Sequence, residues 1–131
     1  MNYGLFSKIS KEEAKIISPV TLAFVGDAVY SLFVRQNLVL ESDSSAAVLQ
    51  KTASEKVSAQ GQNKLLEKIL PLLTPEEEAV FKRGRNAKKT TRSKHATVLE
   101  YNNSTGIEAV IGYLYLSGEY DRIAELLGGI E

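Results

Sequence analysis

Residues 18–40 read SPVTLAFVGDAVYSLFVRQNLVL and predict one long helix that is apolar on nearly every face. Pro19 suits the first turn of a helix, with Ser18 as its N-cap. A helix that is apolar all round belongs in the interior of a domain. Its single acid, Asp27, is costly there unless it is paired, hydrogen-bonded or bound to a metal ion. Gly26 costs a helix about 1 kcal/mol relative to alanine, and close approach by another backbone or a ligand is a reason to keep it.

A second segment has the same character. Residues 105–116, TGIEAVIGYLYL, are apolar on most faces, and Glu108 is their only charge. Two mostly apolar helices in one small domain are expected to pack together. Asp27 and Glu108 are then expected to lie close together. In the alternative, each acid points to solvent at the edge of its helix or accepts an internal hydrogen bond.

Helical spacing of apolar residues also accounts for the rest of the chain, and no segment predicts a strand or a repeat. The sequence therefore predicts an all-α fold, a helical bundle around two central apolar helices. Thr74-Pro75-Glu76-Glu77 is a helix start with a capping box, and Gly118 is a helix-ending residue. The other expected helices are 11–17, 46–60, 75–83, 105–116 and 119–127, and a stripe of apolar residues at helical spacing continues from 60 to Pro71. Asp43 or Ser44 is the expected N-cap of the helix at 46, and Asn103 or Ser104 that of the helix at 105.

Composition limits the class of protein. With 131 residues, the chain is expected to form a single domain over 1–131. The absence of cysteine excludes disulfides and thiolate metal sites. The N-terminal residues have no apolar core of a signal peptide, and the apolar segments are shorter than a membrane span. We therefore expect a cytoplasmic protein with no membrane partner.

The net charge of zero conceals a basic segment. Residues 82–94 hold seven basic residues and no acid, so the remaining chain holds nine basic residues against 16 acids. We expect an exposed, mobile loop over about 84–97 that contacts the phosphates of a duplex, with Gly84 allowing close approach. A solvated charged loop, or one that contacts an acidic partner, explains the same charges. His95, the only histidine, is expected to be a bystander.

The two acids suggest a metal site. Paired carboxylates in a low dielectric repel each other, and a divalent cation relieves that repulsion. Because the chain lacks cysteine, oxygen ligands would dominate, which suits Mg²⁺ with Mn²⁺ as a substitute. Familiar nucleotide and zinc motifs, such as GxxxxGK[ST] and HExxH, are absent.

Several motifs then resemble a known family. FVGDAV resembles the signature of ribonuclease III, and IEAVIGYLYL resembles its second acidic motif. Together with KVSAQGQ and EEEAVFKRGRNAK, in this order, they resemble Mini-ribonuclease III, the short branch without a double-stranded-RNA-binding domain. The resemblance extends over about residues 21–118.

The resemblance implies a homodimeric, Mg²⁺-dependent endoribonuclease that cleaves double-stranded RNA, leaves 5′-phosphates and trims precursor 23S ribosomal RNA, with a ribosomal protein as a further partner. It assigns catalysis and metal binding to Asp27 and Glu108. The positions at which full-length ribonuclease III has further acids are Val20, Ala23 and Thr105, so two acidic ligands remain. The resemblance and the charge pattern together assign RNA binding to Lys82, Arg83, Arg85, Asn86, Lys88, Lys89, Arg92 and Lys94.

Two other classes compete with a nuclease. A non-catalytic RNA-binding or ribosome-associated protein could share this fold, but such a protein has no need of both Asp27 and Glu108. A small interaction module with no RNA role requires the resemblance to be accidental. Metal-dependent cutting of a long RNA duplex separates all three.

Overall fold

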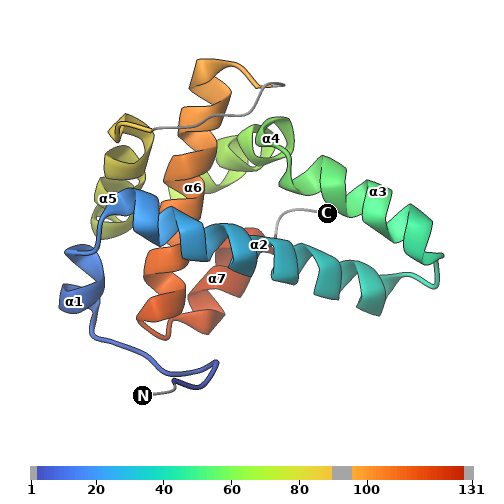
Figure 1. The fold of residues 1–131 in the computed structure, drawn as a ribbon, viewed down its shortest axis with the longest axis horizontal. Coiled ribbons are helices and arrows are strands. Elements are labelled where there is room, and N and C mark those ends of the chain that lie inside the picture. The colour runs from blue at the N-terminus through green and yellow to red at the C-terminus, as the bar shows by residue number, and fades with distance from the viewer. Residues whose placement is uncertain (1–2, 90–95, 129–131) are drawn as a thin grey trace.

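The computed structural model describes residues 3–89 and 96–128, and this part of the chain is helical without any strand. The predicted all-α class is therefore confirmed (Figure 1). No described helix is long and apolar enough to cross a membrane. The elements are α1 (Lys11–Lys15), α2 (Pro19–Glu41), α3 (Ala46–Val57), α4 (Ala59–Ile69), the 3₁₀ turn η1 (Leu70–Leu72), α5 (Pro75–Asn86), α6 (Val98–Leu116) and α7 (Tyr120–Leu127).

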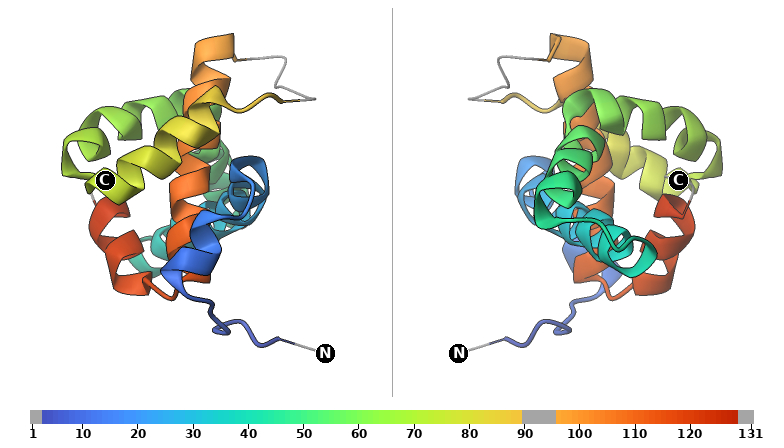
Figure 2. Two further views of the ribbon diagram at one scale, coloured as in Figure 1. Left: turned by 90° about the vertical axis from the view of Figure 1, so that its left-hand side faces the viewer. Right: turned by 90° about the vertical axis from the view of Figure 1, so that its right-hand side faces the viewer.

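Helix α6 is the centre of the fold. It contacts α2, α4, α5 and α7, and Figure 2 shows α2 on one of its sides with α4 and α7 on the other. Every residue from Ser104 to Leu114 is buried except Glu108. The prediction of a central apolar helix is therefore correct for this segment, and its one partly exposed position is the acid.

Helices α2 and α6 cross with their backbones in contact. A Cβ atom added to Gly26 would lie 1.7 Å from the backbone oxygen of Glu108, and one added to Gly112 would lie 1.9 Å from that of Leu22. Only glycine leaves room for such an approach. The expectation that Gly26 serves a close backbone contact is met by α6 itself.

Helix α2 is less buried than its composition suggests. Its buried positions are Leu22, Ala23, Gly26, Tyr30 and Val34, which form one stripe toward α6 and its neighbours. The opposite side leaves large apolar side chains exposed, including Phe24 and Leu32. The expectation of a helix enclosed on all sides is wrong for the single chain, because no described element covers that outer side.

The start of α6 and the division of segment 46–60 differ from the sequence-based expectation. Helix α6 begins at Val98 because Thr97 and Glu100 form a capping box. The hydroxyl of Ser104 donates to the Glu100 carbonyl (2.9 Å) inside the helix instead of capping a new one. The segment 46–60 divides at Ser58, whose side chain accepts from the Gly61 N–H (3.1 Å) and caps α4. A serine can cap a new helix or hydrogen-bond to the backbone within one, and only the tertiary context decides between these two roles.

The other predicted caps agree with the structure except at α3. The Thr74–Glu77 capping box and the left-handed Gly118 (φ 77°) are as predicted, whereas the cap of α3 is Ser45 rather than Asp43 or Ser44. Helix α5 continues to Asn86, so the expected loop over about 84–97 begins too early, because residues 84–86 lie inside α5. Its other end agrees with the structure, because Thr97 is the extended N-cap of α6.

Candidate active site

The structure brings Asp27 and Glu108 together. Gly26, the residue directly before Asp27, packs against the Glu108 backbone, and the side chains of Asp27 and Glu108 are hydrogen-bonded to each other. Asp27 is exposed, whereas Glu108 is half-buried. The expected convergence is thus present, but Glu108 rather than Asp27 is the more buried of the two acids.

The pair is electrostatically strained. Burial raises the pKa of Glu108 to about 8, and the hydrogen bond and negative charge of Asp27 contribute in the same direction. A hydrogen bond from Gln62 lowers it, but by less. Burial, helped by the charge of Glu108, also raises the pKa of Tyr30 to about 12. Near neutral pH, therefore, the isolated pair retains a proton that a cation would displace.

Gln62 is a site residue that the sequence reasoning missed. Its Nε2 donates to Glu108 Oε2 (3.3 Å) and to the Val57 carbonyl (3.1 Å), while its Oε1 is buried without a partner in the described part of the chain. A buried unsatisfied acceptor costs about 1–3 kcal/mol. The available signal was its spacing, because Gln62 precedes Leu65 and Ile69 by three and seven residues on the buried side of α4.

These groups fit a hard cation such as Mg²⁺. Two carboxylates and one unused amide oxygen supply only oxygen atoms, which Mg²⁺ prefers. Among the described residues no cluster of three or more acids or histidines could hold a metal ion. Ala23 is buried, and the Thr105 hydroxyl donates to the Tyr101 carbonyl (3.0 Å). Water and phosphate oxygens would therefore have to complete the coordination.

The basic residues near the end of α5 divide into two groups. Arg83 donates to the carbonyls of Lys15 (2.6 Å) and Ile17 (3.4 Å), and so fastens α5 to the end of α1. Lys89 donates to the carbonyls of Gly84 (2.8 Å) and Arg85 (2.9 Å) at the end of α5. Burial lowers the pKa of Lys89. Both side chains are engaged with backbone carbonyls.

The second group makes only local contacts. Lys82 pairs with Glu78 one turn earlier (2.8 Å), and Arg85 donates to Asn86 Oδ1 (3.1 Å). Asn86 and Lys88 are exposed. Such surface pairs contribute about 0–1 kcal/mol and can be exchanged for a phosphate. Arg92, Lys94 and His95 lie outside the described residues.

Gly84 has a structural role in this region. It is buried in α5, and a Cβ atom there would lie 2.9 Å from the Cα of Gly106 in α6. The expectation that Gly84 allows close approach to a phosphate is therefore wrong, because its lack of a side chain serves the packing of α5 against α6.

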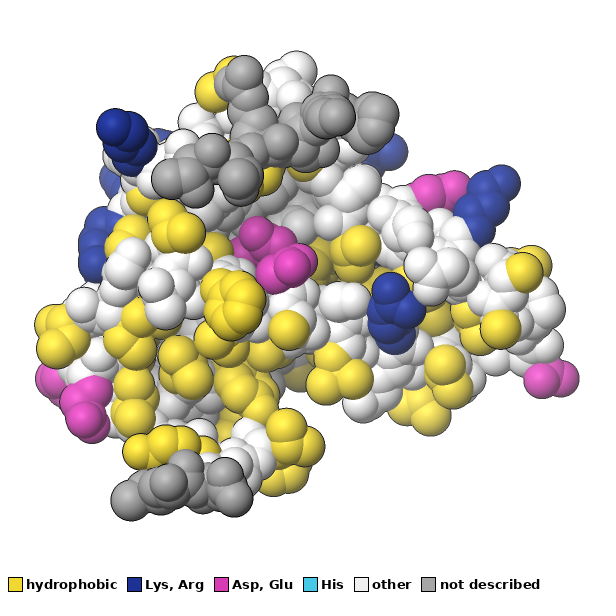
Figure 3. All heavy atoms as spheres, in the orientation of Figure 1, with side chains coloured by type: hydrophobic (Ala, Val, Ile, Leu, Met, Phe, Trp, Pro, Cys, Tyr) yellow, Lys and Arg dark blue, Asp and Glu magenta, His cyan; other side chains and the backbone are white. Residues whose placement is uncertain are grey.

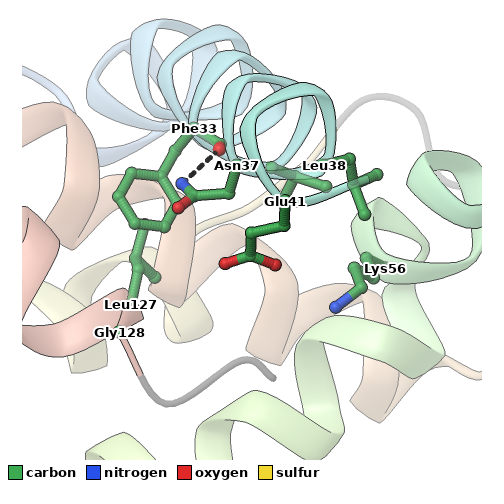
Figure 4. A pocket seen from close by; sticks show the side chains of 8 residues that line it. Phe33, Asn37, Leu38, Glu41, Lys56, Leu127 and Gly128 are labelled. Carbon is green, nitrogen blue, oxygen red and sulfur yellow. Dashed lines mark hydrogen bonds between the residues drawn. The ribbon is translucent and has the colours of Figure 1, made fainter. Parts of the chain in front are cut away.

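A separate hollow of about 100 Å³ lies near the far end of α2. Figure 4 shows Glu41 and Lys56 directed into it, with Phe33, Leu38 and Leu127 as apolar walls. The Asn37 amide is satisfied by the Phe33 carbonyl (2.8 Å). This hollow has one acid rather than a carboxylate pair, and it begins two turns along α2 from Asp27, so it is not an alternative metal site.

Comparison with known proteins assigns the chain to a family. A family model for the ribonuclease III domain matches residues 20–119. The chain is 40% identical over 119 residues to Mini-ribonuclease 3 of Thermoanaerobacter sp. (strain X514), covering 91% of this chain and 84% of the relative. It is 44% identical over 115 residues to Mini-ribonuclease 3 of Brevibacillus brevis, covering 88% and 86%.

A solved structure agrees with these matches. The crystal structure of a Fusobacterium nucleatum protein superimposes with a TM-score of 0.78 at 33% identity, covering 86% of this chain and 90% of that one. The sequence relatives and the fold therefore lead to the same assignment. The chain belongs to the ribonuclease III family, as a ribonuclease of the Mini-ribonuclease III branch.

Proposed function

We propose that this chain is a Mg²⁺-dependent endoribonuclease that cleaves double-stranded RNA, with Asp27 and Glu108 as its catalytic acids and metal ligands. The observation that carries the proposal is the glycine crossing of α2 and α6, which sets these two carboxylates side by side. A divalent cation held there would activate a water molecule and stabilise the charge that develops on the phosphodiester.

The two acids would have different tasks. Asp27 is exposed and can meet an incoming phosphate through the cation, whereas Glu108 accepts a hydrogen bond from Gln62. Because burial and Asp27 raise the pKa of Glu108 to about 8, this carboxyl would release its proton when the cation binds. Metal binding should therefore weaken as the pH falls.

Duplex RNA would be held by the basic segment at the end of α5. Lys82, Arg85, Asn86 and Lys88 present polar groups there, and Arg92 and Lys94 follow in sequence. Residues 82–94 include no aromatic residue, so stacking on single-stranded bases is not favoured. Contacts to the phosphates of a duplex suit the composition better. Arg83 and Lys89 would support this surface by holding its backbone.

The outer side of α2 supports a homodimer. Phe24 (81% exposed) and Leu32 (62%) are large apolar side chains on this outer side. Figure 3 shows hydrophobic side chains gathered over α1 and α2 on this face. Large exposed apolar patches mark interaction surfaces. A symmetric second copy on this side of α2 would place two acid pairs near one interface, one for each RNA strand.

The substrate proposed within this class is precursor 23S ribosomal RNA, paired at its ends. That role would make the protein cytoplasmic, with a ribosomal protein as a further partner. The support is the family assignment at about 40% identity, together with the basic segment.

One assay tests the proposal. A long RNA duplex and a duplex of paired 23S precursor ends are each incubated with the protein in Mg²⁺ and in EDTA. We expect discrete cuts only with Mg²⁺, products that a 5′-phosphate-dependent exonuclease degrades, and faster cutting of the precursor. Binding without cutting would instead favour the non-catalytic RNA-binding protein.

A further inference from the structure

Gln62 combines two properties that packing alone does not explain. Its side chain is 2% exposed, and its Oε1 has no hydrogen-bond partner in the described part of the chain. Its Nε2 is nevertheless fully used, by Glu108 Oε2 and by the Val57 carbonyl. A leucine or methionine would fill the same space without leaving an acceptor unpaired. Packing alone therefore does not account for a glutamine at this position.

The orientation of this amide is determined by its neighbours. Both contacts of Nε2 are oxygen acceptors, at 3.1 and 3.3 Å. Exchanging the two amide atoms would set Oε1 against the Val57 carbonyl oxygen, which has no proton to donate, so that exchange is repulsive. The carbonyl oxygen is therefore the unpaired atom. Since it shares a carbon with Nε2, it lies close to the Glu108 carboxylate.

The backbone that carries Gln62 is also held firmly. The Gln62 N–H donates to the Ser58 carbonyl (2.9 Å), in the first turn of α4. A Cβ atom on Gly61 would lie 2.4 Å from the Glu55 carbonyl, so α4 begins in close contact with the end of α3. The Tyr30 hydroxyl of α2 donates to the Lys56 carbonyl (3.1 Å) in the same place. The backbone of Gln62 therefore belongs to the contact between α3 and α4, which is hydrogen-bonded to α2, the helix that carries Asp27.

We propose that Gln62 is a positioning residue for the metal site. Its Nε2 holds the Glu108 carboxylate toward Asp27, and its Oε1 accepts a hydrogen bond from a water molecule on the cation that these acids bind. The described residues supply only two carboxylates, so metal-bound water is needed, and such water requires acceptors. This inference rests on the proposed function, because it takes the acid pair as the metal site.

The test measures metal binding without RNA. Mn²⁺ affinity is determined by electron paramagnetic resonance for the wild type, Gln62→Leu, Gln62→Glu and Asp27→Asn. The matched control is Gln50→Leu, in which an exposed glutamine that accepts from Arg35 receives the same substitution. Circular dichroism in EDTA checks that each variant is folded, and Gln62→Met replaces Gln62→Leu if the latter is not.

The expected order of affinity separates positioning from packing. Outer contacts of this kind change metal affinity about 10–100-fold, so Gln62→Leu should bind Mn²⁺ about 10–100-fold more weakly than the wild type. Gln62→Glu loses the donor to Glu108 but retains an acceptor and adds a negative charge, so it should bind Mn²⁺ more tightly than Gln62→Leu. A merely structural role predicts the reverse order, because a buried glutamate beside Glu108 disrupts packing more than leucine does.

Two results would overturn the inference in distinguishable ways. Unchanged Mn²⁺ affinity in Gln62→Leu, with binding abolished in Asp27→Asn, would reject the role of Gln62 and leave the acid pair as the metal site. Equal binding by the wild type and Asp27→Asn, or no binding by either, would reject the metal site itself and the inference with it.

Discussion

The backbone of Gly26 in α2 lies directly against the carbonyl of Glu108 in α6, where a Cβ atom would be only 1.7 Å from the Glu108 oxygen. Asp27 follows Gly26 in the chain, so both acids lie at the backbone contact between the two helices. The distance between the carboxylates is therefore set by helix packing rather than by flexible loops. This arrangement makes catalysis and stability depend on the same glycine.

Gly26→Ala should destabilise the protein strongly. The added methyl group meets backbone atoms that cannot rotate away, so α2 and α6 must separate. Overpacking typically costs about 1–3 kcal/mol, and we expect the upper end or beyond. Urea unfolding followed by circular dichroism measures the loss. Gly4→Ala is the matched control, because its nearest neighbour would be 3.9 Å away; equal midpoints for the two variants would contradict the backbone contact.

Asp27→Asn should remove cleavage while preserving the fold. The substitution is nearly isosteric at an exposed position, and it removes one of the two acids. We expect the rate of duplex cleavage to fall at least about 10²–10³-fold, the size of effect seen when one electrostatic contact to a transition state is lost. RNA affinity measured by filter binding should stay close to that of the wild type. Full cleavage by this variant would exclude the acid pair as the catalytic centre.

The stability of the metal-free protein should depend on pH through Glu108. Burial and Asp27 raise its pKa to about 8 in the folded state, so its stabilising contribution is complete at pH 4.5 and is lost as the pH rises through 8. Mg²⁺ binds the deprotonated pair and should raise the melting temperature more at pH 8.5 than at pH 6.

Asp27→Asn provides the control for this pH dependence, because it removes the like charge and leaves the burial of Glu108 in place. The metal-free decline between pH 6 and 8.5 should become shallower, and the effect of Mg²⁺ should be largely lost. A wild-type melting temperature that rises over this range in EDTA would contradict the raised pKa.

RNA binding should separate the two groups of basic residues. Replacing Arg85 and Lys88 with alanine should weaken duplex binding and reduce the slope of log affinity against log salt by about one unit for each lost phosphate contact. Replacing Arg83 and Lys89 should mainly lower the melting temperature, since these side chains hold backbone carbonyls. Fluorescence anisotropy at several salt concentrations measures the slope, and identical slopes for the two double variants would argue against this division.

Phe24→Asp should convert a dimer into a monomer. The side chain is 81% exposed in the single chain, so a charge there should not disturb the core. At a symmetric interface, however, two unpaired carboxylates would be brought together and desolvated. Sedimentation velocity measures the change in mass. Val98→Asp, at another exposed apolar residue on α6, is the control and should leave the mass unchanged; a wild type that sediments as a monomer would exclude the interface.

Local sequence signals determined much of the fold. The apolar spacing identified the helical class, and Thr74 with Glu77 marked the start of α5 because a capping box needs only four consecutive residues. Gly118 was recognisable as a helix end for the same reason. The sequence also isolated Asp27 and Glu108, since each is the single acid of an apolar segment.

Other features were decided only by the tertiary structure, because they depend on contacts between distant segments. Glu108 is more buried than Asp27, since α6 is surrounded while α2 is covered on one side. Arg83 and Gly84 lie in a basic segment, yet Arg83 contacts the end of α1 and Gly84 packs against Gly106 of α6. Gln62 joins the acid pair across 46 residues of sequence. Periodicity identifies the face on which a residue lies, but only the packing of α2, α4 and α6 determines what that face meets.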